Sequence, residues 1–215
     1  MRKIYPTTVS HQSGSHEARK ETPICNDVPM ENDGPKALDP KVAALKDAVT
    51  DIEKFVATDG WDAPIRIFAI VKAVPALEKA PELAEELPAD VAVNAITDPN
   101  TLFSVEQEGL PQASTLEELL AQLAWPEEVD GAAIVAERII VPPSAEMDLP
   151  KDPQRALIAL SEHPEREDVR MAVGYMREGH SWCAVRTRSH DNDADVVGSP
   201  DAVPGLVAAL KATFE

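Results

Sequence analysis

The chain has 215 residues, of which 44% are hydrophobic, and a formal net charge of −18 at pH 7. This apolar content is enough for a packed core and argues against global disorder. The negative charge predicts binding neither to nucleic acid nor to an anionic membrane, because both would meet a repulsive field. No apolar run approaches the roughly 20 residues that span a bilayer, and no apolar stretch follows the charged N-terminus as in a secretory signal. The sequence therefore predicts a cytoplasmic protein.

Residues 1–36 are expected to form a disordered tail. They are polar, contain five basic and five acidic side chains, and show neither a helical nor a strand period. Such a segment buries too little to offset the entropy of ordering. His11, His16 and Cys25 lie in it without any metal-ligand spacing. The remaining residues, 37–215, carry 15 basic and 33 acidic side chains and are predicted to fold as one domain.

A long helix is predicted over about residues 40–58. Asp39 can cap its N-terminus, and Pro40 stands at the first helical position, where its missing N–H costs nothing. Apolar residues then recur every three or four positions until Gly60, which ends the helix. A nearly continuous apolar run over 65–71 follows and predicts a buried strand. The apolar stripe of the helix consists of Val42, Leu45, Val49, Ile52 and Val56.

Proline punctuates the next part of the chain. Residues 76–87 have a helical pattern that Pro81 should kink or shorten. A turn at 98–100 separates two further apolar segments. Short strands are predicted for these segments, at Val91, Val93 and Ile96 and at 102–105.

Two overlapping capping boxes predict a helix after residue 114 that ends before Pro126. The most hydrophobic stretch, 131–141, predicts a strand, and the prolines after it predict a stiff loop. Asp152-Pro153 repeats the cap signature for a short helix to about residue 161. The two capping boxes pair Ser114 with Glu117 and Thr115 with Glu118.

The C-terminal part predicts a β-hairpin, in which 169–176 and 182–185 flank a turn at Glu178-Gly179. Residues 196–197 are expected to re-enter the sheet briefly, and a last helix opens at Ser199-Pro200 or at Val203-Pro204. Strands that gather late in the chain with helices between them predict an α+β domain. Its sheet is expected to be mostly antiparallel and flanked by helices.

The one dense group of polar residues lies at 186–195. Its aspartates alternate as in the first half of an EF-hand calcium loop. Val196 stands where that loop needs glycine, and Ala202 stands where it needs a bidentate glutamate, so an EF-hand is not expected. The candidate site residues are Arg186, Arg188, His190, Asp191, Asp193 and Asp195.

Two interpretations of this group remain open. The aspartates could offer oxygen ligands to Mg²⁺ or Ca²⁺, and the arginines, on one strand face with Trp182, could bind an anion or a flat ligand. In the other interpretation the carboxylates form ion pairs with Arg186 and Arg188 in a solvated loop. A divalent cation is therefore the one cofactor that the sequence leaves open.

Sequence motifs of the known catalytic and nucleotide-binding classes are missing. The chain contains no Walker A segment, no G-x-S-x-G, no G-x-G-x-x-G and no HExxH. Cys183 lies within a predicted strand, where a thiol is usually inert packing. With Cys25 it shows no disulfide spacing.

A family resemblance rests on two stretches. The first is Ala124-Trp125-Pro126-Glu127-Glu128-Val129-Asp130-Gly131, and it continues through Ala136-Glu137-Arg138 to Pro142-Pro143. The second is Ser189-His190-Asp191-Asn192-Asp193-Ala194-Asp195. Together with Ala37-Leu38-Asp39-Pro40 and Gly60-Trp61, these stretches resemble an uncharacterised family of conserved actinobacterial proteins. The resemblance covers about residues 37–215 and implies a bacterial cytosolic protein from that phylum. It brings no activity, ligand or catalytic residue with it.

The acidic domain, the missing motifs and the neutral tail favour a non-enzymatic accessory protein of the adaptor or chaperone type. Within residues 76–130, 13 acids stand against a single base, Lys79, so a basic protein is the expected partner. The alternative is a metal- or anion-dependent enzyme that uses the group at 186–195. The sequence leaves the oligomeric state open.

Overall fold

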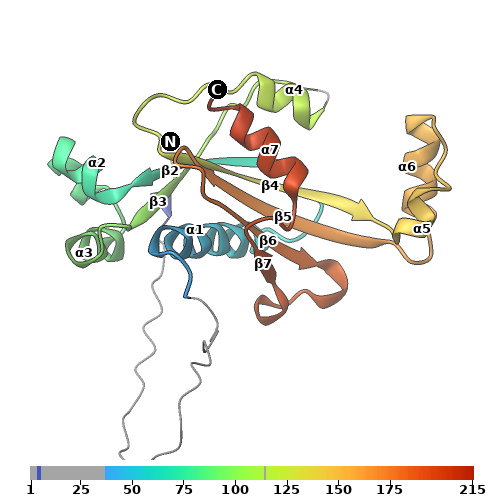
Figure 1. Ribbon diagram of the computed structural model, residues 1–215, viewed down its shortest axis with the longest axis horizontal. Helices are drawn as coiled ribbons and strands as arrows, with labels where there is room; N and C mark the ends of the chain where they lie inside the picture. Colours follow the sequence, from blue (N-terminus) through green and yellow to red (C-terminus); the bar gives the residue numbers. More distant parts are fainter. Residues whose placement is uncertain (1–3, 6–36, 114) are drawn as a thin grey trace, which may run out of the picture.

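The described residues form a seven-stranded antiparallel sheet, and the computed structural model in Figure 1 has helices on both faces of this sheet. The structure describes residues 4–5, 37–113 and 115–215. This architecture confirms the predicted α+β class and the antiparallel sheet flanked by helices. The tail predicted for residues 1–36 lies outside the described residues apart from Ile4–Tyr5, which form a short strand.

The strands follow the order β1-β3-β2-β4-β5-β6-β7. At the centre, β4 and β5 pair along the full ten residues of each strand. The strands predicted at 65–71, 102–105 and 131–141 are confirmed, and so are the C-terminal hairpin and the return of the chain to the sheet. The strands are β1 (Ile4–Tyr5), β2 (Arg66–Lys72), β3 (Leu102–Glu106), β4 (Gly131–Ile140), β5 (Glu167–Met176), β6 (Ser181–Thr187) and β7 (Val197–Ser199).

Several helices begin at the caps that the sequence predicts. The Asp39 carboxylate accepts from the backbone N–H of Lys41 at 2.8 Å, and the Thr115 hydroxyl accepts from that of Glu118 at 3.1 Å. Ser114, the alternative cap, lies outside the described residues. The α-helices are α1 (Pro40–Ala57), α2 (Ala73–Lys79), α3 (Ala89–Thr97), α4 (Leu116–Ala121), α5 (Pro143–Glu146), α6 (Pro153–Glu162) and α7 (Pro204–Ala212). The 3-10 helices are η1 (Pro81–Glu85), η2 (Arg188–His190) and η3 (Asp193–Asp195).

Proline interrupts a helix where the sequence predicts it, and it begins a helix in a segment that was predicted to be a loop. Pro81 interrupts the helical pattern, because α2 ends just before it and η1 begins at it. The predicted stiff loop after β4 contains the four-residue helix α5, which starts at Pro143. Within the part of the chain that the structure describes, no helix combines the length and the apolar character needed to cross a membrane.

The short strand predicted at Val91, Val93 and Ile96 is wrong, because these residues belong to helix α3. Val91 is fully buried, whereas Val93 and Ile96 are exposed by 62% and 83%. Three apolar residues are too few to separate a period of two from a helical period. The side of α3 that carries Val91 packs over β3, next to α2.

Alternate residues of the central strands face two different helical layers, and Figure 1 shows these layers on the two sides of the sheet. The apolar stripe of α1 covers one face, over β2, β4, β5 and β6. Helices α4 and α7 cover the other face, mainly over β4, β5 and β6. On that second face, α2, η1 and α3 pack against one end of β2 and β3.

Helix α1 lies very close to β5 at Gly174. A Cβ atom at this position would lie 2.4 Å from Cγ2 of Val49 and 3.1 Å from Cδ1 of Leu45. A glycine is therefore required for the helix to rest on the strand. One turn further along α1, Glu53 lies over the neighbouring residues of β5 and β6.

Candidate functional site

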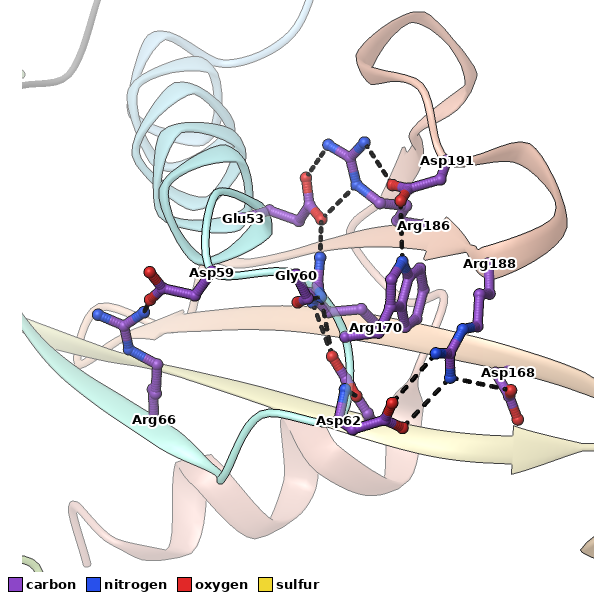
Figure 2. Close-up of polar contacts among 12 residues, drawn as sticks. Glu53, Asp59, Gly60, Asp62, Arg66, Asp168, Arg170, Arg186, Arg188 and Asp191 are labelled. Atoms are coloured by element: carbon purple, nitrogen blue, oxygen red, sulfur yellow. Dashed lines mark hydrogen bonds and ion pairs between the residues drawn. The ribbon is translucent and has the colours of Figure 1, made fainter.

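Two buried arginines on neighbouring strands meet one buried glutamate of α1 (Figure 2). Arg170 of β5 and Arg186 of β6 are direct cross-strand partners. Their exposed fractions are 0% and 2%, and that of Glu53 is 0%. Arg186 donates from Nε to Oε1 of Glu53 at 2.7 Å and from Nη2 to Oε2 at 2.8 Å. This is the bidentate geometry of a strong arginine–carboxylate pair.

Glu53 allows two like charges to lie side by side in the sheet. Like charges directly across a strand pair are destabilising, and a buried charge without a partner is more so. Hydrogen bonding to Glu53 raises the pKa of Arg186 above its ordinary value, against the effect of burial. Oε1 of Glu53 also lies 3.7 Å from Nη1 of Arg170. One carboxylate therefore stabilises both guanidinium groups.

The second arginine is held by three further groups. Nη2 of Arg170 donates to Glu137 of β4 at 2.8 Å and to the carbonyl oxygen of Gly60. The guanidinium carbon lies 4.5 Å from the centroid of the Trp61 ring, in cation–π geometry. Nη1 is buried and has no hydrogen-bond acceptor among the described residues, so its ion pair with Glu53 offsets its burial.

The structure brings three of the six sequence candidates together. Asp191 and Asp193 accept from Arg186 at 3.2 and 2.6 Å. Trp61 donates from Nε1 to Asp191 at 2.9 Å, and this bond, together with Arg186, lowers the pKa of Asp191. Of the two interpretations that the sequence leaves open, ion pairing with the preceding arginine describes Asp191 and Asp193.

The other three candidates do not contact Glu53 or Arg186, although the guanidinium carbon of Arg188 lies 5.5 Å from the centroid of the Trp61 ring. Arg188 donates to the two carboxylate oxygens of Asp62 at 3.2 and 3.0 Å. Nδ1 of His190 lies 2.9 Å from the hydroxyl of the preceding serine. Asp195 is exposed on η3. Because η2 and η3 interrupt the segment, the alternation of aspartates at 191, 193 and 195 does not define one face of a strand.

The loop between α1 and β2 is fastened to this cluster through Asp62. Its backbone has a φ of 67°, in the left-handed region that L residues seldom adopt. The backbone N–H of Asp62 donates to Glu137 at 2.7 Å, and its carboxylate holds Arg188. These contacts hold the strained residue and keep Trp61 over Arg170.

The arginines and carboxylates of the cluster neutralise one another. Among the described residues, no three His, Cys, Asp or Glu side chains are grouped so that they could hold a metal ion. Burial raises the pKa of the Cys183 thiol, which lies in the core. His11, His16 and Cys25 lie outside the described residues. The cluster ties α1, the loop at 60–62 and the loop at 188–195 to the sheet.

A groove of about 1390 Å³ lies on the opposite face of the sheet, over β2 and β3. Its floor consists of Ala69, Val71, Phe103 and Val105, which are cross-strand partners. One wall is formed by α2 and η1, and the other by the loop segments at 107–111 and 123–130. A smaller cavity of about 440 Å³ adjoins the groove at Gln107 and Leu110 and reaches Trp61.

Carboxylates outnumber ammonium groups around this groove. Both lysines that line it are paired, Lys79 with Glu128 at 2.7 Å and Lys72 with Glu178. The groove is therefore apolar at its floor and negative at its rim. The charged lining residues are Glu86, Glu108, Glu127, Glu128 and Asp130 against Lys72 and Lys79.

Sequence reasoning misses Glu53, Arg170 and the groove. Glu53 falls within the apolar stripe of α1, and Arg170 falls among the inward-facing residues of β5. A charged residue at a core-facing position could have indicated the cluster, because such a residue needs a partner of opposite charge. The groove has no such signal, because it is assembled from segments between residues 69 and 130.

Comparison with known proteins gives one match. Residues 45–215 match the family described as PPA1309-like protein. This region is nearly the same as the one marked by the family resemblance of the sequence, 37–215. No curated protein and no solved structure matches the chain.

Proposed function

The chain belongs to the PPA1309-like protein family, and we propose that it is a non-enzymatic accessory protein that binds a basic, partly apolar segment of a partner protein in the groove over β2 and β3. The observation that carries this proposal is an apolar floor inside a rim of carboxylates. A protein of the adaptor or chaperone type needs such a surface, because it holds another chain and transforms no substrate.

The size and the floor of the groove suit a polypeptide. Small-molecule sites usually have volumes of about 300–1,000 Å³, and this groove has about 1390 Å³. Covering apolar surface stabilises a complex by roughly 25 cal/mol per Å² before the costs of association. Val71 and Val105 are half-buried and offer such surface on the floor, and Leu83 and Leu110 offer it on the walls.

The charge of the rim selects the sign of the partner. Five carboxylates line the groove against two paired lysines, and the whole chain has a net charge of −18. A segment with Lys or Arg beside its apolar residues is attracted to this field, whereas an acidic segment is repelled. Charge therefore sets both the rate of encounter and the choice of partner.

The enzyme alternative at 186–195 has weaker support. A metal ion bound there would have to displace Arg186 from Asp191 and Asp193. The buried guanidinium group would then lose two of its carboxylate partners, which is unfavourable. We also propose that the protein is cytoplasmic and of actinobacterial origin.

The test is a titration of the full-length chain with two synthetic peptides that share their apolar residues. One peptide has lysine flanks and the other has glutamate flanks. We expect calorimetry to show the lysine peptide binding at least about tenfold more tightly. Reversing the rim with Glu127→Lys and Glu128→Lys should remove most of this preference.

A matched control changes the net charge by the same amount elsewhere. Glu162→Lys and Glu165→Lys lie at the exposed end of α6 and beyond it, away from the groove (Figure 1). This double variant should bind the lysine peptide within about twofold of the unchanged chain. Equal binding of both peptides, or an equal loss in both double variants, would contradict the proposal.

A further inference from the structure

We infer that the segment held in the groove is a short amphipathic helix, with its apolar stripe on β2 and β3 and basic residues along both sides of that stripe. This inference rests on the proposed function and adds the conformation and the charge pattern of the partner. It follows from the backbone pairing, the helical layers, the size and the rim of the groove.

Much of the backbone of the floor is already paired. Strand β2 lies between β3 and β4, and β3 pairs with β2 on one side and with β1 at Ser104 and Val105 on the other. An extended segment on this floor would meet side chains and find no ladder to join, so its N–H and C=O groups would be buried without partners. A helix satisfies its own backbone groups and avoids this penalty.

The layers of the domain point to the same occupant. Helix α1 covers one face of the sheet, and α4 with α7 covers the other face mainly over β4, β5 and β6. Figure 1 shows α2 at the end of the sheet away from α7, and the groove lies over β2 and β3. A sheet buries its apolar face against helices in such α+β domains. Helices α2, η1 and α3 already cover one end of β2 and β3, so a helix from the partner would fill the space between α2 with η1 and the loops at 107–111 and 123–130.

The floor sets the extent of the apolar stripe. It comprises Ala69 and Val71 of β2 and Phe103 and Val105 of β3. The partner segment is therefore short, and its apolar stripe needs only three or four large side chains.

The rim sets where the basic residues lie. Glu86 belongs to the wall that continues from η1, whereas Glu108, Glu127 and Glu128 belong to the opposite wall. A helix between the walls meets carboxylates along both edges of its apolar stripe. Lysine or arginine is therefore expected on both sides of the stripe, at positions where a long side chain can reach the rim.

The experiment compares two peptides of equal composition, made of leucine and lysine. One places leucine at i, i+3, i+4 and i+7, and the other alternates leucine and lysine. With the full-length chain we expect the helical pattern to bind at least about tenfold more tightly, and circular dichroism should show a gain of helix in the complex. A central proline in the helical peptide should abolish most of the binding.

The outcomes separate the two proposals. Equal or tighter binding of the alternating peptide would overturn the helix while leaving the basic partner in place. Binding of neither peptide would remove the proposed function itself. A variant of the wall, Leu83→Ala, should weaken the helical peptide, and unchanged affinity in a folded Leu83→Ala protein would place the peptide elsewhere. A dimer of the free chain that Glu127→Lys and Glu128→Lys dissociate would make a second copy the occupant and overturn the inference.

Discussion

The two faces of the sheet use charge in opposite ways. On the α1 face, Glu53, Arg170 and Arg186 are buried and neutralise one another. On the other face, carboxylates stand around an apolar floor with too few lysines to balance them. In a chain of net charge −18, the role of a charged residue therefore depends more on its position than on the total number of charged residues. Buried charges hold the fold together, and the excess of carboxylates at the rim favours a partner of opposite charge.

The buried cluster and the rim should therefore affect different properties, the first the stability of the fold and the second the binding of a partner. A change within the buried cluster should alter the free energy of unfolding and leave the groove as it is. A change at the rim should do the reverse, because exposed charges contribute little to stability. The following experiments test this separation, beginning with the largest expected effect.

Removing the shared carboxylate should have the greatest effect. Glu53→Gln leaves two buried guanidinium groups without their common counter-charge, and breaking a buried pair in this way costs about 3–5 kcal/mol. Urea unfolding followed by circular dichroism measures the loss. Glu82→Gln on the exposed surface of η1 is the control and should stay within about 0.5 kcal/mol of the unchanged chain. A loss below about 1 kcal/mol for Glu53→Gln would show that the cluster does not stabilise the fold.

Salt should distinguish the two faces next. Raising the salt concentration from about 50 to 500 mM should weaken binding of the lysine-flanked peptide by roughly tenfold, because the rim charges are screened. The stability difference between the unchanged chain and Glu53→Gln should stay nearly constant, since buried pairs are screened much less. Calorimetry and urea unfolding at both salt concentrations provide the two measurements. A peptide affinity that does not change with salt would show that the rim charges do not contribute to binding in the groove.

Asp191→Asn should give a smaller effect that depends on pH. The hydrogen bond from Trp61 and the charge of Arg186 lower the pKa of Asp191 in the folded chain. Its stabilising contribution is therefore complete above the ordinary aspartate pKa of about 3.9 and is lost as the pH falls towards the lower folded value. Because the side chain is about half exposed, we expect a loss of about 1 kcal/mol at pH 7. In urea unfolding, the difference from the unchanged chain should shrink below about pH 4. A difference that is constant from pH 7 to pH 3 would contradict this assignment.

The strained loop should give the smallest effect. Asp62 has a positive φ and an exposed ion pair with Arg188. Asp62→Ala loses the pair and keeps the strain, whereas Asp62→Gly loses the pair and relieves the strain. Thermal unfolding should therefore show the glycine variant to be more stable than the alanine variant by about 0.5–1 kcal/mol. The reverse order would show that the loop is not strained.

Much of the fold could be predicted from residue patterns. The stripe from Val42 to Val56 and the apolar runs of β2, β4 and β5 are long enough to reveal their periods. The short segment at 91–96 is not, and its assignment as a strand also hid one of the helices next to the groove. Local patterns therefore predict elements well only where they extend over several turns or pairs.

The cluster and the groove differ in what the sequence reveals of them. Arg186, Asp191 and Asp193 are neighbours in the chain, so their pairing was one of the stated alternatives. Glu53 lies 133 positions from Arg186, and only the packing of α1 on the sheet brings them together. The floor of the groove looks like ordinary core in the sequence, because the half-buried Val71 and Val105 have the same apolar character as the buried Ala69 and Phe103 beside them.

The close approach of α1 at Gly174 has an electrostatic consequence. Val49, which touches Gly174, and Glu53 are one turn apart on the helix, so the spacing at the glycine sets how far the carboxylate reaches. A single methyl group at position 174 would lift the helix and lengthen the contacts of Glu53 with both arginines. A neutral substitution that touches no charged side chain would thus behave in unfolding experiments like the loss of an ion pair.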